Sequence, residues 1–194
     1  MTRTRASNLN NDMLSSNRWS SSWFLFLCCL ALVASSIAQS APRMPRIEGE
    51  SLAGHKINLP EAAAGKVAVL VFGFTKASKE PTGAWAERLQ AEFGSRSDFE
   101  LYQLPVLEDI PRLFRGMVIS GIRKGVAENK RDHFVPILQG EVALKKLVQY
   151  REPDDAYLVV LDRAGNILEQ SHGSLDDSAY ARLRAHIDSA LSQK

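Results

Sequence analysis

Residues Val67 to Phe74 read VAVLVFGF, a run without a polar side chain. Most of its members are β-branched or aromatic, which are the residue types that strands favour. A strand that buries one face alternates apolar and polar side chains, whereas a continuous apolar run of this length is typical of a strand buried on both faces. We therefore expect a central strand of a sheet over these residues.

The segment after this strand predicts a helix and a second strand. Trp85, Leu89 and Phe93 recur every four residues with charged residues between them, and Gly94 follows, which indicates an amphipathic helix with a glycine stop. Residues 99–106 (FELYQLPV) alternate and end at a proline, as a strand does. A strand, helix and strand in this order imply two parallel strands joined by a right-handed crossover.

The second half of the chain predicts helices around a hairpin. Residues 110–127 have helical spacing interrupted by three glycines, so we expect two helices or a kinked one. Residues 156–170, with a turn at Asp162 to Asn166, predict a β-hairpin. In the closing segment Ser174, with Asp177 three residues later, is expected to cap a final helix. The predicted fold class is α/β, with a central mixed sheet flanked by helices.

Residues 1–40 carry a different signal. Three arginines precede the uncharged run WFLFLCCLALVA, and small residues follow. This order predicts an export signal peptide, cleaved near Ala38 or Ser40. The run is shorter than the roughly 20 residues of a spanning helix, and retention as a membrane anchor is the alternative. We expect the periplasm or cell envelope; a mitochondrial inner-membrane location is the second interpretation.

Residues 41–194 have the size of a single domain, and a short apolar alternation near their start predicts an edge strand or hairpin. Removing the leader takes away 3 of the 24 basic residues and 1 of the 22 acidic ones, so the mature chain is neutral and gives no reason to expect a nucleic-acid partner. Both cysteines, Cys28 and Cys29, lie in the leader, which excludes thiol chemistry from the mature chain. The four histidines lack paired spacing, and we expect no metal and no cofactor.

Two segments carry a resemblance to a known superfamily. LAGHKINLPEAAAGKVAVLVF is similar to the opening of exported thiol reductases and peroxiredoxins, and YLVVLDRAGNIL is similar to their late hairpin. Through them the chain resembles the thioredoxin-like superfamily from Ile47 to Leu191. The resemblance implies a thioredoxin-like fold for residues 41–194.

The same resemblance shows which reactive residues are missing. In the reductase alignment the two cysteines of Cys-x-x-Cys fall on Ala77 and Glu80; in the peroxiredoxin alignment Thr75 matches the threonine and the peroxidatic cysteine falls on Ser78. Ala156 stands where thioredoxins hold a cis-proline. A serine hydroxyl does not attack disulfides or peroxides as a thiolate does unless a base activates it. We therefore interpret the loop as a degenerate, redox-inactive site and expect Ser78 to cap the helix.

A cysteine-free branch of the superfamily is similar at three places. TGAW, GIRKGVAENKRDHFVPI and YLVVLDRAGNI resemble the assembly factor of the mitochondrial ATP synthase and its bacterial relatives. The resemblance implies a chaperone-like protein that holds a membrane subunit of ATP synthase during assembly. It places Arg123 and Lys124 in the basic turn of that family.

Two hypotheses of function follow. The first is a binding module or assembly chaperone for a protein partner, held in a groove between residues 75–81 and 153–157. The second is an oxidoreductase scaffold of the thiol reductase or peroxiredoxin type, whose activity depends on a residue other than cysteine. The candidate partner-binding residues are Trp85, Ala156, Tyr157, Arg123 and Lys124. For Trp85 the helix stripe favours core packing, with an edge facing the groove as the alternative. The absent thiol favours the first hypothesis.

Overall fold

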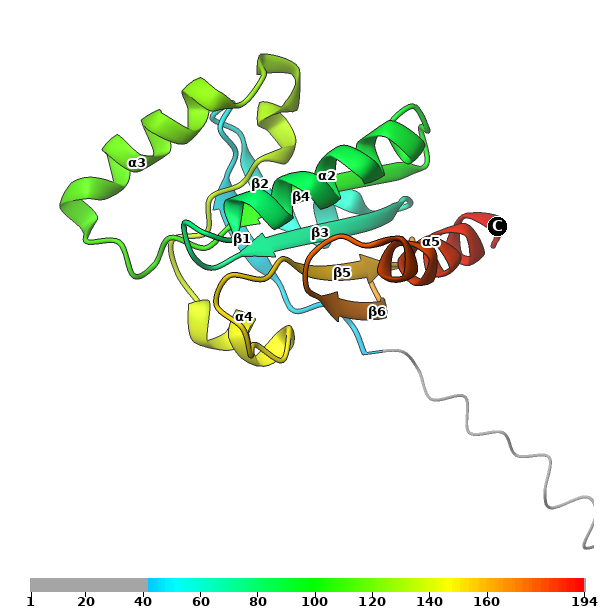
Figure 1. The fold of residues 1–194 in the computed structure, drawn as a ribbon. Coiled ribbons are helices and arrows are strands. Elements are labelled where there is room, and N and C mark those ends of the chain that lie inside the picture. The colour runs from blue at the N-terminus through cyan, green and yellow to red at the C-terminus, as the bar shows by residue number, and fades with distance from the viewer. Residues whose placement is uncertain (1–41, 194) are drawn as a thin grey trace, which may run out of the picture. The chain divides into compact units, whose positions relative to one another are not determined.

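The structure is a computed structural model that describes residues 42–193 (Figure 1). The predicted signal peptide lies outside the described residues, and its cleavage stays a prediction. In chain order the elements are β1 (Ile47–Glu50), β2 (Lys56–Leu59), η1 (Glu61–Ala63), β3 (Val67–Gly73), α2 (Lys79–Phe93), β4 (Phe99–Pro105), α3 (Arg112–Gly125), η2 (Glu128–His133), α4 (Glu141–Leu147), β5 (Tyr157–Leu161), β6 (Ile167–His172) and α5 (Asp177–Ser192).

The main sheet has four strands in the order β4-β3-β5-β6. β3 pairs in parallel with β4 and antiparallel with β5, and β5 pairs antiparallel with β6. The mixed sheet and the central place of the apolar strand are therefore confirmed. β1 and β2 form a separate antiparallel pair, which confirms a hairpin near the start of the mature chain.

Alternate residues of β3 feed two cores. Val67, Val69 and Val71 pack with apolar side chains of α2 and α5 on one face of the sheet. Their neighbours in the strand, among them Leu70 and Phe72, pack on the other face with the β1–β2 hairpin, the segment 135–137 and α4. Within the described residues, each face of the sheet therefore has its own core.

The turn between β5 and β6 shows why the predicted hairpin forms. The carboxylate of Asp162 accepts hydrogen bonds from the backbone N–H groups of Ala164 and Asn166 and from the Asn166 side chain, each 2.8 Å long. Gly165 adopts φ +83°, a left-handed conformation that favours glycine. The Gly165 backbone also approaches Pro60 so closely that a Cβ there would lie 2.8 Å from the ring.

Three predictions about helices were incomplete or wrong. α3 is one continuous helix from Arg112 to Gly125, so its three glycines do not divide it in two. The cap of α5 is Asp176, whose carboxylate accepts a hydrogen bond from the Ala179 N–H, and Ser174 does not cap it. α4 was not predicted, because its seven residues provide too little periodicity to read.

Candidate functional site

The loop after β3 holds the positions of the degenerate redox site. Thr75, Ala77 and Glu80 are exposed, and Ser78 is 1% exposed. The loop lies beside the start of β5, because Phe72 of β3 pairs with Tyr157. A hydrogen bond from the Thr75 hydroxyl to the Asp154 carboxylate, 2.8 Å long, joins the two sides. The two walls of the predicted groove are therefore tied together in this structure.

Ser78 uses its side chain inside this loop. Its hydroxyl donates to the Thr75 carbonyl at 2.8 Å and accepts from the Thr75 N–H at 3.3 Å. The side chain makes no capping bond to α2, so the expectation of a conventional helix cap was wrong, although Ser78 does precede the first residue of the helix. Its proton is held by a backbone carbonyl instead of a basic side chain, so nothing in this arrangement activates the oxygen as a nucleophile.

Gly73, the last residue of β3, has no Cβ and therefore allows the Ser78 side chain to lie close to its backbone. A Cβ on Gly73 would lie 2.6 Å from the Ser78 Oγ and 3.2 Å from a methyl carbon of Thr82. Thr82 in turn donates its hydroxyl to the Ser78 carbonyl at 2.8 Å. The loop is thus packed around the serine hydroxyl. This packing leaves no space for a substrate beside Ser78, as a reactive serine would require.

The three aromatic and small residues predicted to touch a partner are interior. Trp85 is 1% exposed and donates its indole N–H to the Gly173 carbonyl at 3.0 Å. Ala156 and Tyr157 have no exposed surface, and the Tyr157 hydroxyl donates to the Glu152 carbonyl. Packing of Trp85 in the core is what the helix stripe favoured. A partner at this edge would meet the loop residues and not these three side chains.

Aromatic rings lie beneath the loop. Phe74 meets Tyr150 and Tyr157 edge to face, and His172 stacks on Tyr157 with ring centroids 5.4 Å apart. The ammonium of Lys145 lies 4.7 Å from the Tyr150 ring centroid.

Two pKa shifts favour the charged lysine beside the neutral ring. A hydrogen bond with Glu141 raises the pKa of Lys145, and burial raises the pKa of Tyr150. Both directions agree with a cation–π contact between the two side chains.

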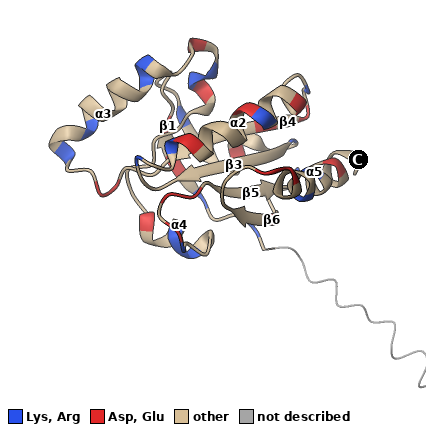
Figure 2. Ribbon diagram, viewed as in Figure 1, with Lys and Arg blue, Asp and Glu red and all other residues tan. Residues whose placement is uncertain are grey.

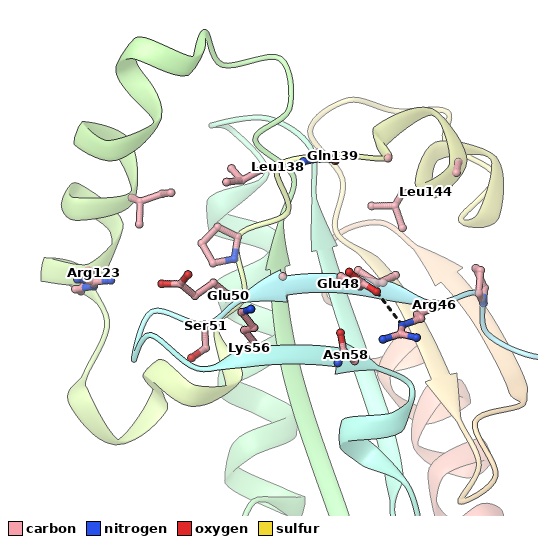
Figure 3. Close-up of a pocket in the computed structure, with 17 residues that line it drawn as sticks. Arg46, Glu48, Glu50, Ser51, Lys56, Asn58, Arg123, Leu138, Gln139 and Leu144 are labelled. Atoms are coloured by element: carbon pink, nitrogen blue, oxygen red, sulfur yellow. Dashed lines mark ion pairs between the residues drawn. The ribbon is translucent and has the colours of Figure 1, made fainter.

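A cavity of about 740 Å³ lies elsewhere, over the β1–β2 hairpin (Figure 3). Its floor is β1 and the facing side chains of β2. Its walls are α3 on one side and residues 136–140 with the start of α4 on the other. The charged and amide side chains around it are Arg46, Glu48, Glu50, Lys56, Asn58, Arg123 and Gln139. Of the predicted site residues, Arg123 lines this cavity, whereas Lys124 is exposed and is not among the lining residues.

The sequence of β1 has the pattern of a strand with one polar face, which was not predicted. Arg46, Glu48 and Glu50 alternate with the buried Ile47 and with Gly49. Gly49 lies against the segment beneath, and a Cβ there would be 2.5 Å from a Val135 methyl carbon. Period-two alternation of this kind indicates a strand with one polar face, which the short length of the segment concealed.

Within residues 42–193 no group of three or more histidine, cysteine, aspartate or glutamate side chains is placed to hold a metal ion. Over the same residues, no helix has both the length and the apolar character required to cross a bilayer.

No protein-family model matches the sequence, and no curated protein matches it. Solved structures do match. A thioredoxin-like superfamily protein aligns with a TM-score of 0.57 and 16% identity over 79% of this chain and 99% of its own. DsbE of Chlorobium tepidum, described as a thiol:disulfide interchange protein, gives 0.55 and 16% over 79% and 99%. The described domain has a thioredoxin-like fold.

A third solved structure with this fold is BsSco, a member of the Sco family of cytochrome c oxidase assembly proteins. It aligns with a TM-score of 0.55 and 13% identity over 79% of this chain and 96% of its own. Solved structures with this fold thus include a protein described as a thiol:disulfide interchange protein and a member of a family of cytochrome c oxidase assembly proteins. At identities of this size the likeness is one of fold.

Proposed function

We propose that residues 41–194 form a redox-inactive thioredoxin-fold protein that binds a partner polypeptide in the cell envelope. The observation that carries the proposal is the lack of any cysteine in these residues, together with a serine hydroxyl that is engaged by its own loop. A fold whose usual chemistry needs a thiolate keeps its surfaces when the sulfur is absent. Binding is the function that those surfaces can still perform.

The cavity over β1 is the surface that we assign to the partner. β1 pairs with β2 along one edge, and no strand of residues 42–193 pairs with its other edge. All residues from Pro45 to Ser51 line the cavity, whereas β2 contributes only Lys56 and Asn58. An extended segment added beside a free strand edge gains main-chain hydrogen bonds, a common way to bind a polypeptide.

Charge around the cavity indicates the chemistry of that segment. Arg123 lies on its wall, while Arg46 pairs with Glu48 at 3.0 Å on the floor. Arg123 forms no ion pair with an acidic side chain of residues 42–193, so an acidic group on the partner would complement it. The proposed partner segment is extended and carries a carboxylate near Arg123.

We further propose that the protein acts as an assembly chaperone for a membrane complex, with a membrane subunit of ATP synthase as the candidate partner. The resemblance at TGAW, GIRKGVAENKRDHFVPI and YLVVLDRAGNI supports this partner. The fold of BsSco supports the class of function, because that neighbour belongs to a family of assembly proteins. The leader supports an envelope location.

Affinity capture of the tagged full-length protein from detergent-solubilised membranes, followed by mass spectrometry, tests this function. We expect ATP synthase membrane subunits among the enriched proteins. An R123E variant should lose them, and R182E, which reverses one exposed arginine of α5, serves as the matched control. Equal capture by both variants would contradict the assigned surface, and capture of no membrane subunit would contradict the assembly role.

The alternative, an oxidoreductase without cysteine, is tested on purified residues 41–194. Reduction of insulin disulfides and consumption of hydrogen peroxide are measured against a thioredoxin and a peroxiredoxin. We expect no turnover above the uncatalysed rate, because no thiolate is present to attack either substrate. Turnover by the wild-type domain that S78A abolishes would replace the binding function with an enzymatic one.

A further inference from the structure

α3 leaves a stripe of apolar side chains, Leu113, Phe114 and Met117, exposed to the surroundings. Ile119 and Arg123 line the cavity, which fixes the side of the helix that faces the rest of the molecule. Met117 is two positions from Ile119, about 160° round the helix, and Phe114 is nine positions from Arg123, about two and a half turns away. Both therefore point outward.

The exposure of these side chains agrees with that geometry. Leu113 is 86% exposed, Met117 69% and Phe114 49%, and no residue of α3 is buried. Helices at the surface of a soluble domain normally turn their apolar stripe toward the core. In α3, Val118, Ile119 and Ile122 are half-buried, whereas the stripe of Leu113, Phe114 and Met117 is left uncovered by the described residues.

The amino-acid composition of α3 gives the isolated helix little stability. It contains Gly116, Gly121 and Gly125, each of which lowers helix stability relative to alanine. A helix of this length without packing is marginal in water. On the domain side its start is held by Arg115, whose guanidinium donates to the carbonyls of Glu108 and Ile110. A surface that covered the apolar stripe would supply the missing packing.

Charge identifies the covering surface. Residues 112–125 contain four basic side chains and no acidic one, and Figure 2 shows α3 in blue and tan only. Lys124 is eleven positions from Leu113 and seven from Met117, so it lies on the apolar stripe itself. A second copy of α3 would bring like charges together, which opposes pairing, and one 14-residue helix covers far less than the roughly 800 Å² per partner of a stable interface.

We infer that α3 binds the surface of an anionic lipid bilayer, lying in the headgroup region with Leu113, Phe114 and Met117 in the acyl boundary. The exposed stripe of α3 consists of aromatic and aliphatic side chains, and the charged side chains of the helix are all basic. Helices that lie in the membrane interface have this composition. Anionic headgroups attract the exposed Arg112 and Lys124, and the apolar side chains provide the rest of the binding. This inference does not rest on the proposed function, because it concerns the opposite side of α3 from the cavity.

Co-sedimentation of residues 41–194 with vesicles tests it. Vesicles of phosphatidylglycerol and phosphatidylcholine should bind the protein, and vesicles of phosphatidylcholine alone should bind it at least tenfold less. Raising the salt from about 0.1 M to about 1 M shortens the Debye length from about 10 Å to about 3 Å and should weaken the binding severalfold.

Variants assign the binding to α3. L113Q/M117Q and R112Q/K124Q should each lower the bound fraction at least tenfold. V142Q is the matched control, because Val142 is 85% exposed and apolar but belongs to α4, and it should bind like the wild type. Circular dichroism of each variant checks that the fold is retained. Failure of the wild type to bind anionic vesicles, or equal binding by L113Q/M117Q, would overturn the inference.

A protein surface instead of a lipid surface gives a different outcome. In that case the wild type does not bind vesicles. The L113Q/M117Q variant fails to capture a membrane protein that the wild type and V142Q both capture. This outcome would make α3 a protein-docking helix and the lipid assignment wrong. The cavity variant R123E is kept out of this comparison, because Arg123 belongs to the proposed polypeptide site. If the wild type binds anionic vesicles but captures no partner polypeptide, the proposed function is wrong and the lipid assignment stands.

Discussion

At the scale of single residues, Ser78 has a structural role in the loop after β3. Its hydroxyl pairs with both the N–H and the carbonyl of Thr75 and lies close to the Gly73 backbone. The Ser78 side chain therefore helps to fix the conformation of this loop.

Ser78→Ala should lower the stability of the domain by about 0.5–1.5 kcal/mol, because it removes the hydroxyl that pairs with the Thr75 N–H and carbonyl. Urea denaturation of residues 41–194 measures the change. Ser95→Ala, at an exposed position in the loop after α2, is the control and should change the midpoint little. Equal midpoints for the two variants would mean that the Ser78 hydroxyl does not hold the loop.

A second residue-scale prediction concerns acid stability and Asp162. Burial alone would raise the pKa of Asp162, but hydrogen bonds from Asn166, Ala164 and Gly165 outweigh it and hold the pKa below its usual value. Because the folded pKa is lower than the unfolded one, the unfolded chain binds more protons in acid. The carboxylate therefore contributes stability above about pH 4, and this is lost as the pH falls through the folded pKa.

D162N should consequently be less stable than the wild type at pH 7 and should lose less stability than the wild type between about pH 5 and pH 3. Urea midpoints across this range test the sign. D109N, which removes an exposed carboxylate outside the turn, should run parallel to the wild type. Parallel curves for D162N and the wild type would show that the turn does not depend on the charge.

At the scale of elements, two helices show where a sequence pattern is sufficient and where it is not. The stripe of Trp85, Leu89 and Phe93 predicted α2 and its buried face correctly, since an apolar stripe beside a buried strand can only pack against it. The stripe of α3 has the same period, yet it faces outward. Periodicity predicts that a helix has an apolar stripe, but the tertiary fold determines whether that stripe packs against the core.

The glycines of α3 allow a prediction about that helix. A Cβ at Gly121 would have no neighbour within 4 Å, so alanine fits there without strain. Gly121→Ala should stabilise α3 by about 1 kcal/mol. Slower amide hydrogen exchange along residues 112–125 is the expected readout. Gly165→Ala is the opposite control and should destabilise the domain, because its φ of +83° and its contact with Pro60 both require glycine.

At the scale of the whole molecule, the described domain is one sheet with a core on each face. The apolar run of β3 predicted a central strand, because a strand apolar on both faces requires two covering layers. The thioredoxin-like fold was predicted from the order of the elements and from the resemblance of two segments to that superfamily. The cavity over β1 could not be predicted, since it arises from segments that lie far apart in the chain and meet only after folding.

The shared sheet predicts cooperative unfolding. Leu104 is fully buried on the face opposite to Trp85, so Leu104→Ala should cost about 2–5 kcal/mol. Trp85 is the only tryptophan of residues 41–194 and reports on the other face. We expect its fluorescence and the far-UV circular dichroism to shift to the same lower urea midpoint. Separate midpoints would mean that the two faces unfold independently.

The first and the late parts of the described chain meet beside the β5–β6 turn. The Met44 N–H donates to the Gly165 carbonyl, and the Ile167 N–H donates to the Pro42 carbonyl. β5, which completes the pairing of β3, also follows it by more than eighty residues. A nascent chain emerging from a ribosome or a secretion pore therefore cannot close this domain until residue 167 has left the tunnel.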